Sequence, residues 1–393
     1  MANRYYDLAF AGQVFSVRRP SCWTDAEEEE FFKLWSGCLI GTGDGCIVGG
    51  NSREIAVGGI CDDPLKPRIT GVPEYKDPSK FSYRFGQELT MQAITAATGS
   101  MLMLHGAGLT SPNRNTLAFI APSGTGKSTL VRRLGAHFGY VTDELVAVDQ
   151  QGIVHPYPKP VSCVLPGVPR RKRDVSPSDF GLTSVANTTT MSGIILLERD
   201  RQVTNPRLEP VPLREALRAA VPQTSALWSA PWMLRSLVRY LSFAGTPRKL
   251  VYSEADSCGS LLDELFSEID ASSVGLQRNS MDKSNGLQLG LAAREREIVE
   301  ILAAVRYPGE GECGHARYTQ GIRVDDTLAV LGRDGLLELS TAAGILWESF
   351  RCPSPVEENL DQLYLSGVLP CDQRSNALLL VQELIEKNVL VLG

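Results

Sequence analysis

Histidine is scarce in this chain of 393 residues, and cysteine never occurs at the spacing typical of metal sites. The four histidines stand apart, and none of the nine cysteines forms a C-x-x-C pair. Structural zinc sites are built from clustered ligands of these types, so the sequence argues against a zinc protein. Scattered thiols without pairing indicate a reducing compartment rather than a disulfide-bonded, secreted protein.

The chain also lacks an excess of positive charge and a long apolar run. Its 39 Lys and Arg residues stand against 45 Asp and Glu residues, which gives a net charge of -6. Nucleic-acid binding proteins usually carry a basic face, and a membrane-spanning helix needs roughly 20 apolar residues. The first residues, MANRYYDLAF, do not resemble a signal peptide. We therefore expect a cytoplasmic protein that binds neither nucleic acid nor membrane.

Composition and periodicity divide the sequence into four parts. We expect a β-rich N-terminal subdomain, an α/β domain, a linker that includes a stretch rich in Ser, Asn and Gly, and a small α+β domain. Their predicted limits are residues 1–95, 96–270, 271–315 and 316–393.

Local patterns predict several elements within these parts. We expect one strand over Tyr6–Val17, a helix over Asp25–Trp35 and a helical segment from Gln87 to Met103. A second set belongs to the α/β domain: strands Thr116–Ile120, Tyr140–Val148 and Gly193–Leu197, with a helix over Ser128–Phe138. Because strand, loop, helix and strand follow one another, we expect a largely parallel sheet.

The segment Ala121–Thr129, APSGTGKST, connects a predicted buried strand to a predicted helix. It matches the pattern G-x-x-x-x-G-K-[ST], except that Ala121 replaces the first glycine. In such loops the glycines let backbone N–H groups surround a phosphate, Lys adds a charge, and the hydroxyl after it binds Mg²⁺. We expect phosphate contacts from a run of seven residues: Ser123, Gly124, Thr125, Gly126, Lys127, Ser128 and Thr129.

Two acidic residues, Asp143 and Glu144, follow within the next predicted strand. A parallel strand beside the first would end at the same edge of the sheet, close to the bound phosphate. Asp143 is therefore a candidate base that takes a proton from an accepting hydroxyl, and its alternative role is to cap a turn. Glu198, which follows the apolar run Gly193–Leu197, is an alternative Mg²⁺ ligand.

These motifs together resemble the core of the HPr kinase/phosphorylase family, over about 45 residues. The shared order is Leu104-His105-Gly106, then the loop with Lys127 and Ser128, then Val141-Thr142-Asp143-Glu144. The resemblance implies a P-loop fold like that of phosphoenolpyruvate carboxykinase, with ATP and Mg²⁺ as cofactors. It also implies catalytic roles for Lys127, Asp143 and His105, and a metal-binding role for Glu144. HPr kinases form hexamers, so a homo-oligomer is compatible with the resemblance.

The more similar relatives within that family are HPr-kinase-like proteins of peptide-modification gene clusters, which also show a segment like Tyr157-Pro158-Lys159-Pro160. Lys159 is a candidate second positive charge on the transferring phosphoryl group. The basic run Arg170-Arg171-Lys172-Arg173 is a candidate contact to phosphate or to an acidic peptide, although most charge runs are only solvated. Arg170 and Arg171 are the residues we expect to make that contact.

The C-terminal part resembles the PqqD-like peptide-recognition modules, which are small winged-helix-like domains. The similar features are a predicted hairpin over Thr327–Leu339 with a Gly-Arg-Asp-Gly turn, followed by Leu339-Ser340-Thr341, Ile345-Leu346-Trp347 and Pro355-Val356-Glu357-Glu358, and a last helix that ends Leu384-Ile385-Glu386-Lys387-Asn388. The three predicted helices are Thr341–Phe350, Val356–Ser366 and Ser375–Lys387, with a final strand over Val389–Leu392, and we expect Trp347 in the core. Such modules bind a leader peptide along an exposed strand edge, where unpaired N–H and C=O groups are available. A generic winged helix is the alternative interpretation.

Both resemblances together predict an ATP-dependent kinase that phosphorylates a Ser or Thr hydroxyl of a ribosomal precursor peptide or small protein. The C-terminal module would bind the leader peptide and raise the local concentration of the acceptor. Two alternatives remain open at this point. One is a kinase for small-molecule hydroxyls, and the other is a non-catalytic nucleotide-binding switch or peptide chaperone.

Overall fold

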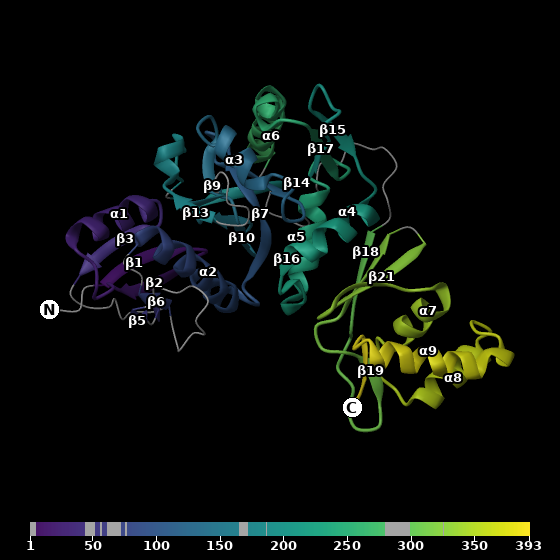
Figure 1. Ribbon diagram of the computed structural model, residues 1–393. Coiled ribbons are helices and arrows are strands. Elements are labelled where there is room, and N and C mark those ends of the chain that lie inside the picture. The colour runs from purple at the N-terminus through teal and green to yellow at the C-terminus, as the bar shows by residue number, and fades with distance from the viewer. Residues whose placement is uncertain are drawn as a thin grey trace. The chain divides into compact units, whose positions relative to one another are not determined.

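The protein is a mixed α/β structure in the computed structural model (Figure 1). The described residues are 5–43, 52–55, 57–60, 72–74, 77–164, 172–185, 187–279, 299–324 and 326–393. No helix among them is long and apolar enough to cross a membrane. The chain divides into two compact units, the first made of Met1–Val211, Gln223–Ser225 and Tyr240–Leu289, and the second of Pro212–Pro222, Ala226–Arg239 and Gly290–Gly393.

The N-terminal part of the first unit begins with a hairpin where we expected one strand. Strands β1 (Tyr5–Phe10) and β2 (Gln13–Arg18) pair antiparallel. Between them, Ala11 and Gly12 both have positive φ, at 47° and 70°, which is the geometry of tight hairpin turns. The sheet has the order β3-β1-β2-β4. The other strands of this region are β3 (Leu39–Gly43), β4 (Ser52–Ile55), β5 (Val57–Ile60) and β6 (Val72–Glu74).

Two helices pack together beside this hairpin. The predicted helix α1 (Asp25–Trp35) is confirmed and begins with a capping box at Thr24. Helix α2 (Pro78–Ala97) begins earlier and ends earlier than predicted, because Asp77 caps it and a strand starts at Met101. Rings from both helices contact one another, and Trp35 and Phe85 lie 4.9 Å apart between centroids. This aromatic packing fixes α2 against α1.

The central sheet of the first unit has nine described strands and is mixed rather than largely parallel as expected. Its main order is β11-β10-β7-β8-β14-β17-β15. Only β8, β14 and β17 pair in parallel, while β7 (Met101–Thr110) is antiparallel to its neighbours. The remaining bounds are β8 (Asn115–Ile120), β9 (Gly139–Thr142), β10 (Leu145–Asp149), β11 (Ile153–His155), β14 (Thr189–Arg199), β15 (Arg207–Pro210), β16 (Thr224–Ser225) and β17 (Arg248–Tyr252).

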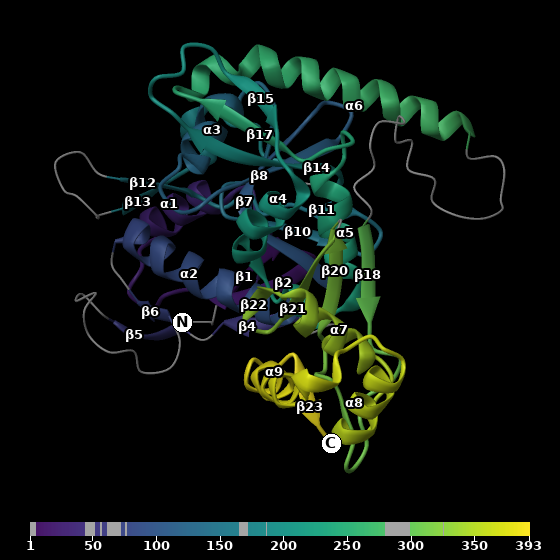
Figure 2. The same ribbon diagram turned by 90° about the vertical axis from the view of Figure 1, so that its right-hand side faces the viewer.

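One face of this sheet is covered by helices α3 (Lys127–Leu134) and α6 (Gly259–Asn279). Helix α3 is shorter than predicted because it ends at Gly135, and Phe138 then turns into the core against Phe266. Helix α6 is one long helix (Figure 2) that extends to Asn279, into the segment predicted as linker. A separate hairpin of β12 (Val161–Val164) and β13 (Lys172–Val175) lies beside α3 and α2.

The second unit contains a four-stranded antiparallel sheet of order β18-β20-β21-β22. The predicted hairpin and the three predicted helices are confirmed, and Trp347 lies in the core as expected. Two strands, β18 and β19, fall within the predicted linker, so the folded part begins earlier than expected. The bounds are β18 (Val299–Ala303), β19 (Cys313–His315), β20 (Gln320–Val324), β21 (Thr327–Gly332), β22 (Gly335–Glu338), β23 (Leu390–Leu392), α7 (Thr341–Ser349), α8 (Val356–Leu365) and α9 (Arg374–Glu386).

Helix α4 (Leu213–Ala220) belongs to this second unit. The Arg214 and Arg218 guanidinium groups both bind the Glu338 carboxylate on β22. Leu217 lies against the same sheet beside Leu336. The helix α5 (Pro231–Leu241) follows it in the chain. An insertion from the middle of the chain therefore forms part of the C-terminal unit, which the sequence alone did not reveal.

Candidate active site

The first unit holds a cavity of about 600 Å³. Its lining comes from the phosphate-loop segment, from the junction of β9 and β10, from the β12–β13 hairpin and from helices α1 and α2. Segments far apart in sequence therefore meet at one hollow, and most of the predicted site residues lie in it.

The loop between β8 and α3 has the backbone that phosphate binding requires. Gly124 and Gly126 have φ values of +89° and +116°, which side-chain-bearing residues rarely adopt. A Cβ added at Gly126 would lie 2.8 Å from the Tyr252 hydroxyl oxygen, so glycine is also required there by space. Thr125 does not line the cavity, and its carbonyl accepts a hydrogen bond from Tyr252. The predicted contacts that do line it are Ser123, Gly124, Gly126, Lys127, Ser128 and Thr129.

Lys127 is folded back onto its own loop. Its Nζ donates to the carbonyl oxygens of Ala121, at 2.6 Å, and of Pro122, at 3.4 Å. Burial lowers the pKa of Lys127, and the nearby Asp143 carboxylate opposes that effect. The substituted position Ala121 thus contributes through its backbone, so the loss of glycine there leaves the loop intact.

Asp143 reaches the cavity because the strand that we predicted over Tyr140–Val148 is interrupted. Strands β9 and β10 both pair with β7, and Asp143 and Glu144 lie in the break between them. The Thr142 hydroxyl accepts hydrogen bonds from the backbone N–H groups of Glu144 and Leu145, at 3.2 and 3.3 Å. This turn releases both acidic side chains from the alternating pattern of a strand.

The direction of these strands explains why Asp143 lies near the phosphate loop. Strand β7 separates β8 from β9 and is antiparallel to both. Strands β8 and β9 are therefore parallel without being neighbours, and both end at the same edge of the sheet. The expected edge was correct, although the two strands are not adjacent as we expected.

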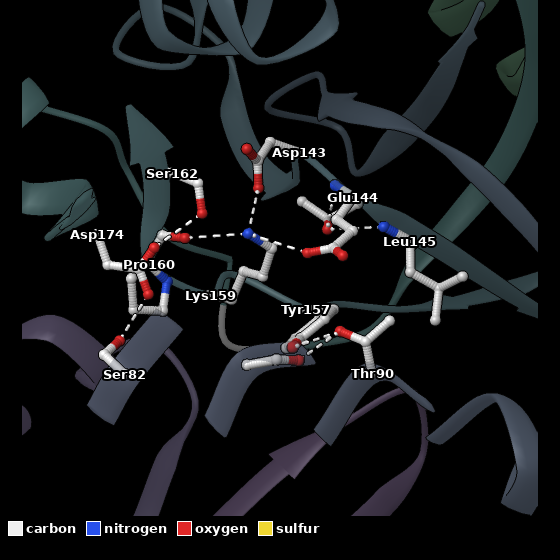
Figure 3. Close-up of polar contacts among 12 residues, drawn as sticks. Ser82, Thr90, Asp143, Glu144, Leu145, Tyr157, Lys159, Pro160, Ser162 and Asp174 are labelled. Atoms are coloured by element: carbon white, nitrogen blue, oxygen red, sulfur yellow. Dashed lines mark hydrogen bonds and ion pairs between the residues drawn. The ribbon is translucent and has the colours of Figure 1, made fainter. Parts of the chain in front are cut away.

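Lys159 lies between the two carboxylates (Figure 3). Its Nζ is 3.2 Å from Asp143 Oδ1 and 3.0 Å from Glu144 Oε2, and it donates to the Pro160 carbonyl at 3.1 Å. A lysine ammonium has three N–H donors, so these contacts occupy all of them. We interpret Lys159 as the residue that holds both carboxylates, and its contact with a phosphoryl group stays a prediction.

The charges around Lys159 also set its protonation. Burial alone would lower the pKa of Lys159, but Asp143 and Glu144 raise it well above its usual value. The Tyr140 hydroxyl shares its one proton between Asp143 Oδ1, at 3.3 Å, and the Lys159 carbonyl oxygen, at 3.1 Å. Burial raises the pKa of this phenol well above its usual value. Asp143 is thus buried with a protonated lysine and a neutral tyrosine as partners.

The other predicted residues have different outcomes. His105 lines the cavity, and its pKa is lowered by desolvation and by Lys127. Glu198 is not among the cavity residues and binds the Lys249 ammonium at 2.6 Å, so its role as a metal ligand stays a prediction. Arg170 and Arg171 lie outside the described residues, while the next residue of that run, Lys172, lines the cavity.

Sequence reasoning missed the N-terminal wall of the cavity. Trp35 of α1, together with Tyr83 and Gln87 of α2, lines it, as does the buried Asp174 of β13. Only the apolar periodicity of α1 and α2 could be read locally, and it predicts helices without indicating a site. These residues meet through tertiary packing between segments that are about 50 to 140 positions apart.

Comparisons with known proteins add little at this level. No protein-family model matches the chain. The chain is 40% identical over 68 residues to the phosphate import ATP-binding protein PstB 1 of Synechococcus sp. (strain JA-2-3B'a(2-13)), which is 17% of this chain and 24% of that protein. The chain thus spans about a quarter of that curated relative. The HPr(Ser) kinase/phosphatase from Coxiella burnetii aligns with 45% of this chain and 98% of its own, at 12% identity and a TM-score of 0.27.

Proposed function

We propose that this protein transfers the γ-phosphoryl group of ATP to a hydroxyl group of a peptide. The observation that carries the proposal is the shared cavity: the interrupted strand brings Asp143 to the same hollow as the phosphate loop. A loop that binds phosphate is common to many nucleotide-binding proteins, but a buried carboxylate beside it suits proton removal from an acceptor. The comparisons do not identify the acceptor, and the peptide is part of the proposal.

The loop would hold the phosphates of ATP through its backbone. Its N–H groups and the N-terminus of α3 provide positive partial charge, and Gly124 and Gly126 let the backbone approach closely. Lys127 would exchange its contacts with Ala121 and Pro122 for phosphate oxygens. Its present partners are backbone carbonyl groups of the loop, so this exchange needs only a side-chain movement.

The cavity also suits Mg²⁺. The Ser128 hydroxyl and the Glu144 carboxylate both line it, and Mg²⁺ prefers such oxygen ligands. Ser128 and Glu144 would hold it, and the ion would neutralise charge on the phosphates.

Asp143 would accept the proton of the acceptor hydroxyl while that oxygen bonds to the γ-phosphorus. The bond from the γ-phosphorus to its bridging oxygen breaks in the same step, and ADP leaves. Lys159 and the Tyr140 hydroxyl fix the Asp143 carboxylate, so it is oriented before the substrate binds. His105, at the edge of the cavity, is placed to contact the phosphates or the acceptor.

We further propose that the C-terminal sheet binds an extended segment of the acceptor peptide. Strands β18 and β22 terminate the described sheet, so each has one edge without a described partner strand. Such edges accept a peptide through backbone hydrogen bonds. Hydrogen exchange on the full chain, with a peptide encoded beside its gene, tests this: slowed exchange in β18 or β22 is expected, and unchanged exchange in both would refute it.

Mass spectrometry of candidate peptides after incubation with ATP and Mg²⁺ tests the transfer itself. We expect phosphate on a Ser or Thr of the peptide, and its loss with Lys127→Ala. Lys249→Ala is a matched control, because Lys249 pairs with Glu198 and neither residue lines the cavity. Transfer to free metabolites alone would favour a small-molecule kinase, and ATP binding without transfer to any acceptor would favour a nucleotide-binding switch.

A further inference from the structure

Asp174 is a buried, acidic residue in the wall of the cavity, whereas the phosphate loop contributes the basic residue Lys127. Its side chain is held by two hydroxyl groups (Figure 3): Ser82 Oγ donates to Oδ2 and Ser162 Oγ donates to Oδ1, both at 2.7 Å. Ser82 in turn accepts a hydrogen bond from Trp35 Nε1 at 2.9 Å. The residue is only 5% exposed, yet it lines the cavity.

Asp174 differs from the other two carboxylates of the cavity in having no cation beside it, among the described residues, to balance its charge. Asp143 and Glu144 share the Lys159 ammonium within 3.2 Å. Asp174 forms no ion pair with any residue that the structure describes. Burial raises the pKa of Asp174, although Lys159 and the two serines oppose this effect. Burying a charged carboxylate without a cation is costly, and a cationic group bound in the cavity would offset that cost.

The two sides of the cavity differ in chemistry. The loop side offers Lys127, Ser128 and Arg132, which suit the phosphates of the nucleotide. The side formed by α1, α2 and β13 offers Trp35, Tyr83 and Gln87 together with Asp174, and Lys172 of the same strand also lines the cavity. The Asp174 carboxylate repels phosphates, so the surface around it suits the acceptor.

We propose that Asp174 binds the acceptor, and that it selects peptides with a cationic side chain next to the phosphorylated hydroxyl. The proposal rests on the proposed function and names its substrate class. Each Asp174 oxygen already accepts one hydroxyl proton and retains a second lone pair for an ammonium or guanidinium group. Ser82 and Ser162 fix the carboxylate, so helix α2 positions the residue that recognises the acceptor.

Three peptides of the sequence Ala-X-Ser-X-Ala, with X as Lys, Gln or Glu, test the proposal. Phosphate transfer from ATP and equilibrium binding in the presence of ADP are both measured for each peptide. We expect the wild-type protein to favour the Lys peptide over the Glu peptide by about tenfold or more, as for a hydrogen bond between charged groups. Asp174→Asn should reduce this preference to about twofold while the affinity for ATP is unchanged.

Two further variants serve as controls. Ser162→Ala retains the carboxylate but removes one of its two hydroxyl donors, so it should lower the preference for the Lys peptide less than Asp174→Asn does. Asp361→Asn removes a carboxylate from α8, in the other unit, and should change neither preference nor affinity. If Asp174→Asn does not fold, the wild-type preference still decides, because equal use of the three peptides overturns the proposal.

The outcomes separate this proposal from the proposed function. Transfer without charge preference, or a preference that survives Asp174→Asn, refutes the role of Asp174 and leaves the kinase intact. Preferential binding that depends on Asp174, without any transfer, refutes the kinase and supports the acceptor site. Neither transfer nor preferential binding refutes both. A lowered melting temperature of Asp174→Asn with an unchanged preference would show that Asp174 only fastens α2 to β12.

Discussion

Replacing Lys159 with methionine removes the cation between two acidic side chains and retains most of the buried aliphatic stem. Asp143 is almost fully buried, and Lys159 is its only ion-pair partner among the described residues. At 3.2 Å and an effective dielectric constant of about 20, their attraction is about 5 kcal/mol before desolvation is subtracted. Removing one partner of a buried pair typically costs about 3–5 kcal/mol, and we expect Lys159→Met to lose about 3 kcal/mol.

A double-mutant cycle separates this pair from general packing. Asp143→Asn alone leaves Lys159 with Glu144, so its cost should be smaller, at about 1–2 kcal/mol. In the double variant, position 143 carries no charge that Lys159 would have to balance. We therefore expect a coupling energy of about 2 kcal/mol between the two positions. The result would identify Lys159 as the residue that stabilises the Asp143 carboxylate.

The assay is hydrogen exchange followed by mass spectrometry along a urea series, because it reports β9 and β10 apart from the C-terminal unit. The C-terminal unit is the internal reference and should be unchanged by these variants. A loss below about 0.5 kcal/mol for Lys159→Met, or a coupling energy near zero, would refute the reasoning.

Two other predictions concern the loop and the C-terminal core. Gly126→Ala should weaken ATP binding at least about tenfold in fluorescence titrations, because its φ of +116° and the nearby Tyr252 hydroxyl both disfavour a Cβ. Gly181→Ala is the control: its φ of +68° strains an alanine, but no atom lies within 4 Å of the added Cβ. That variant should lower stability and leave ATP binding unchanged. Burial of His315 lowers its pKa from 6.5 to about 4, so the unfolded chain binds more protons in this window. The free energy of unfolding of the C-terminal unit should therefore fall by about 3 kcal/mol as pH falls from 6.5 to 4. In urea titrations, His315→Leu should reduce this dependence on pH. The control His137→Gln, at an exposed histidine, should leave it unchanged.

Local sequence signals were sufficient to predict the phosphate loop and the C-terminal hairpin. Four of the five residues of Thr116–Ile120 are apolar and glycines follow, so strand β8 and its loop were predictable. The C-terminal hairpin was predictable from the Gly-Arg-Asp-Gly turn, in which Gly335 has φ +115°. In both cases the signal lies within a few residues of the feature that it predicts.

The other features depend on packing between distant segments. Met101–Leu104 is apolar and fits a helix as well as a strand, and only its pairing with β10 and β16 makes it β7. Asp174 lies beside Ser82, which is 92 positions away. The Lys249 ammonium that binds Glu198 is 51 positions away. No local pattern specifies such partners, so the wall of the cavity that contains Asp174 could not be predicted.

The rate of phosphate transfer by Asp143→Asn tests most directly whether the phosphate loop and Asp143 form one site. The substitution keeps the shape of the side chain and removes its ability to accept the proton. The measurement is single-turnover transfer from radiolabelled ATP to the best acceptor peptide, with the ATP affinity measured in parallel. We predict a rate lower by about 10²–10⁴ with ATP affinity within about threefold of the wild type. A rate that stays within about threefold of the wild type would contradict the account.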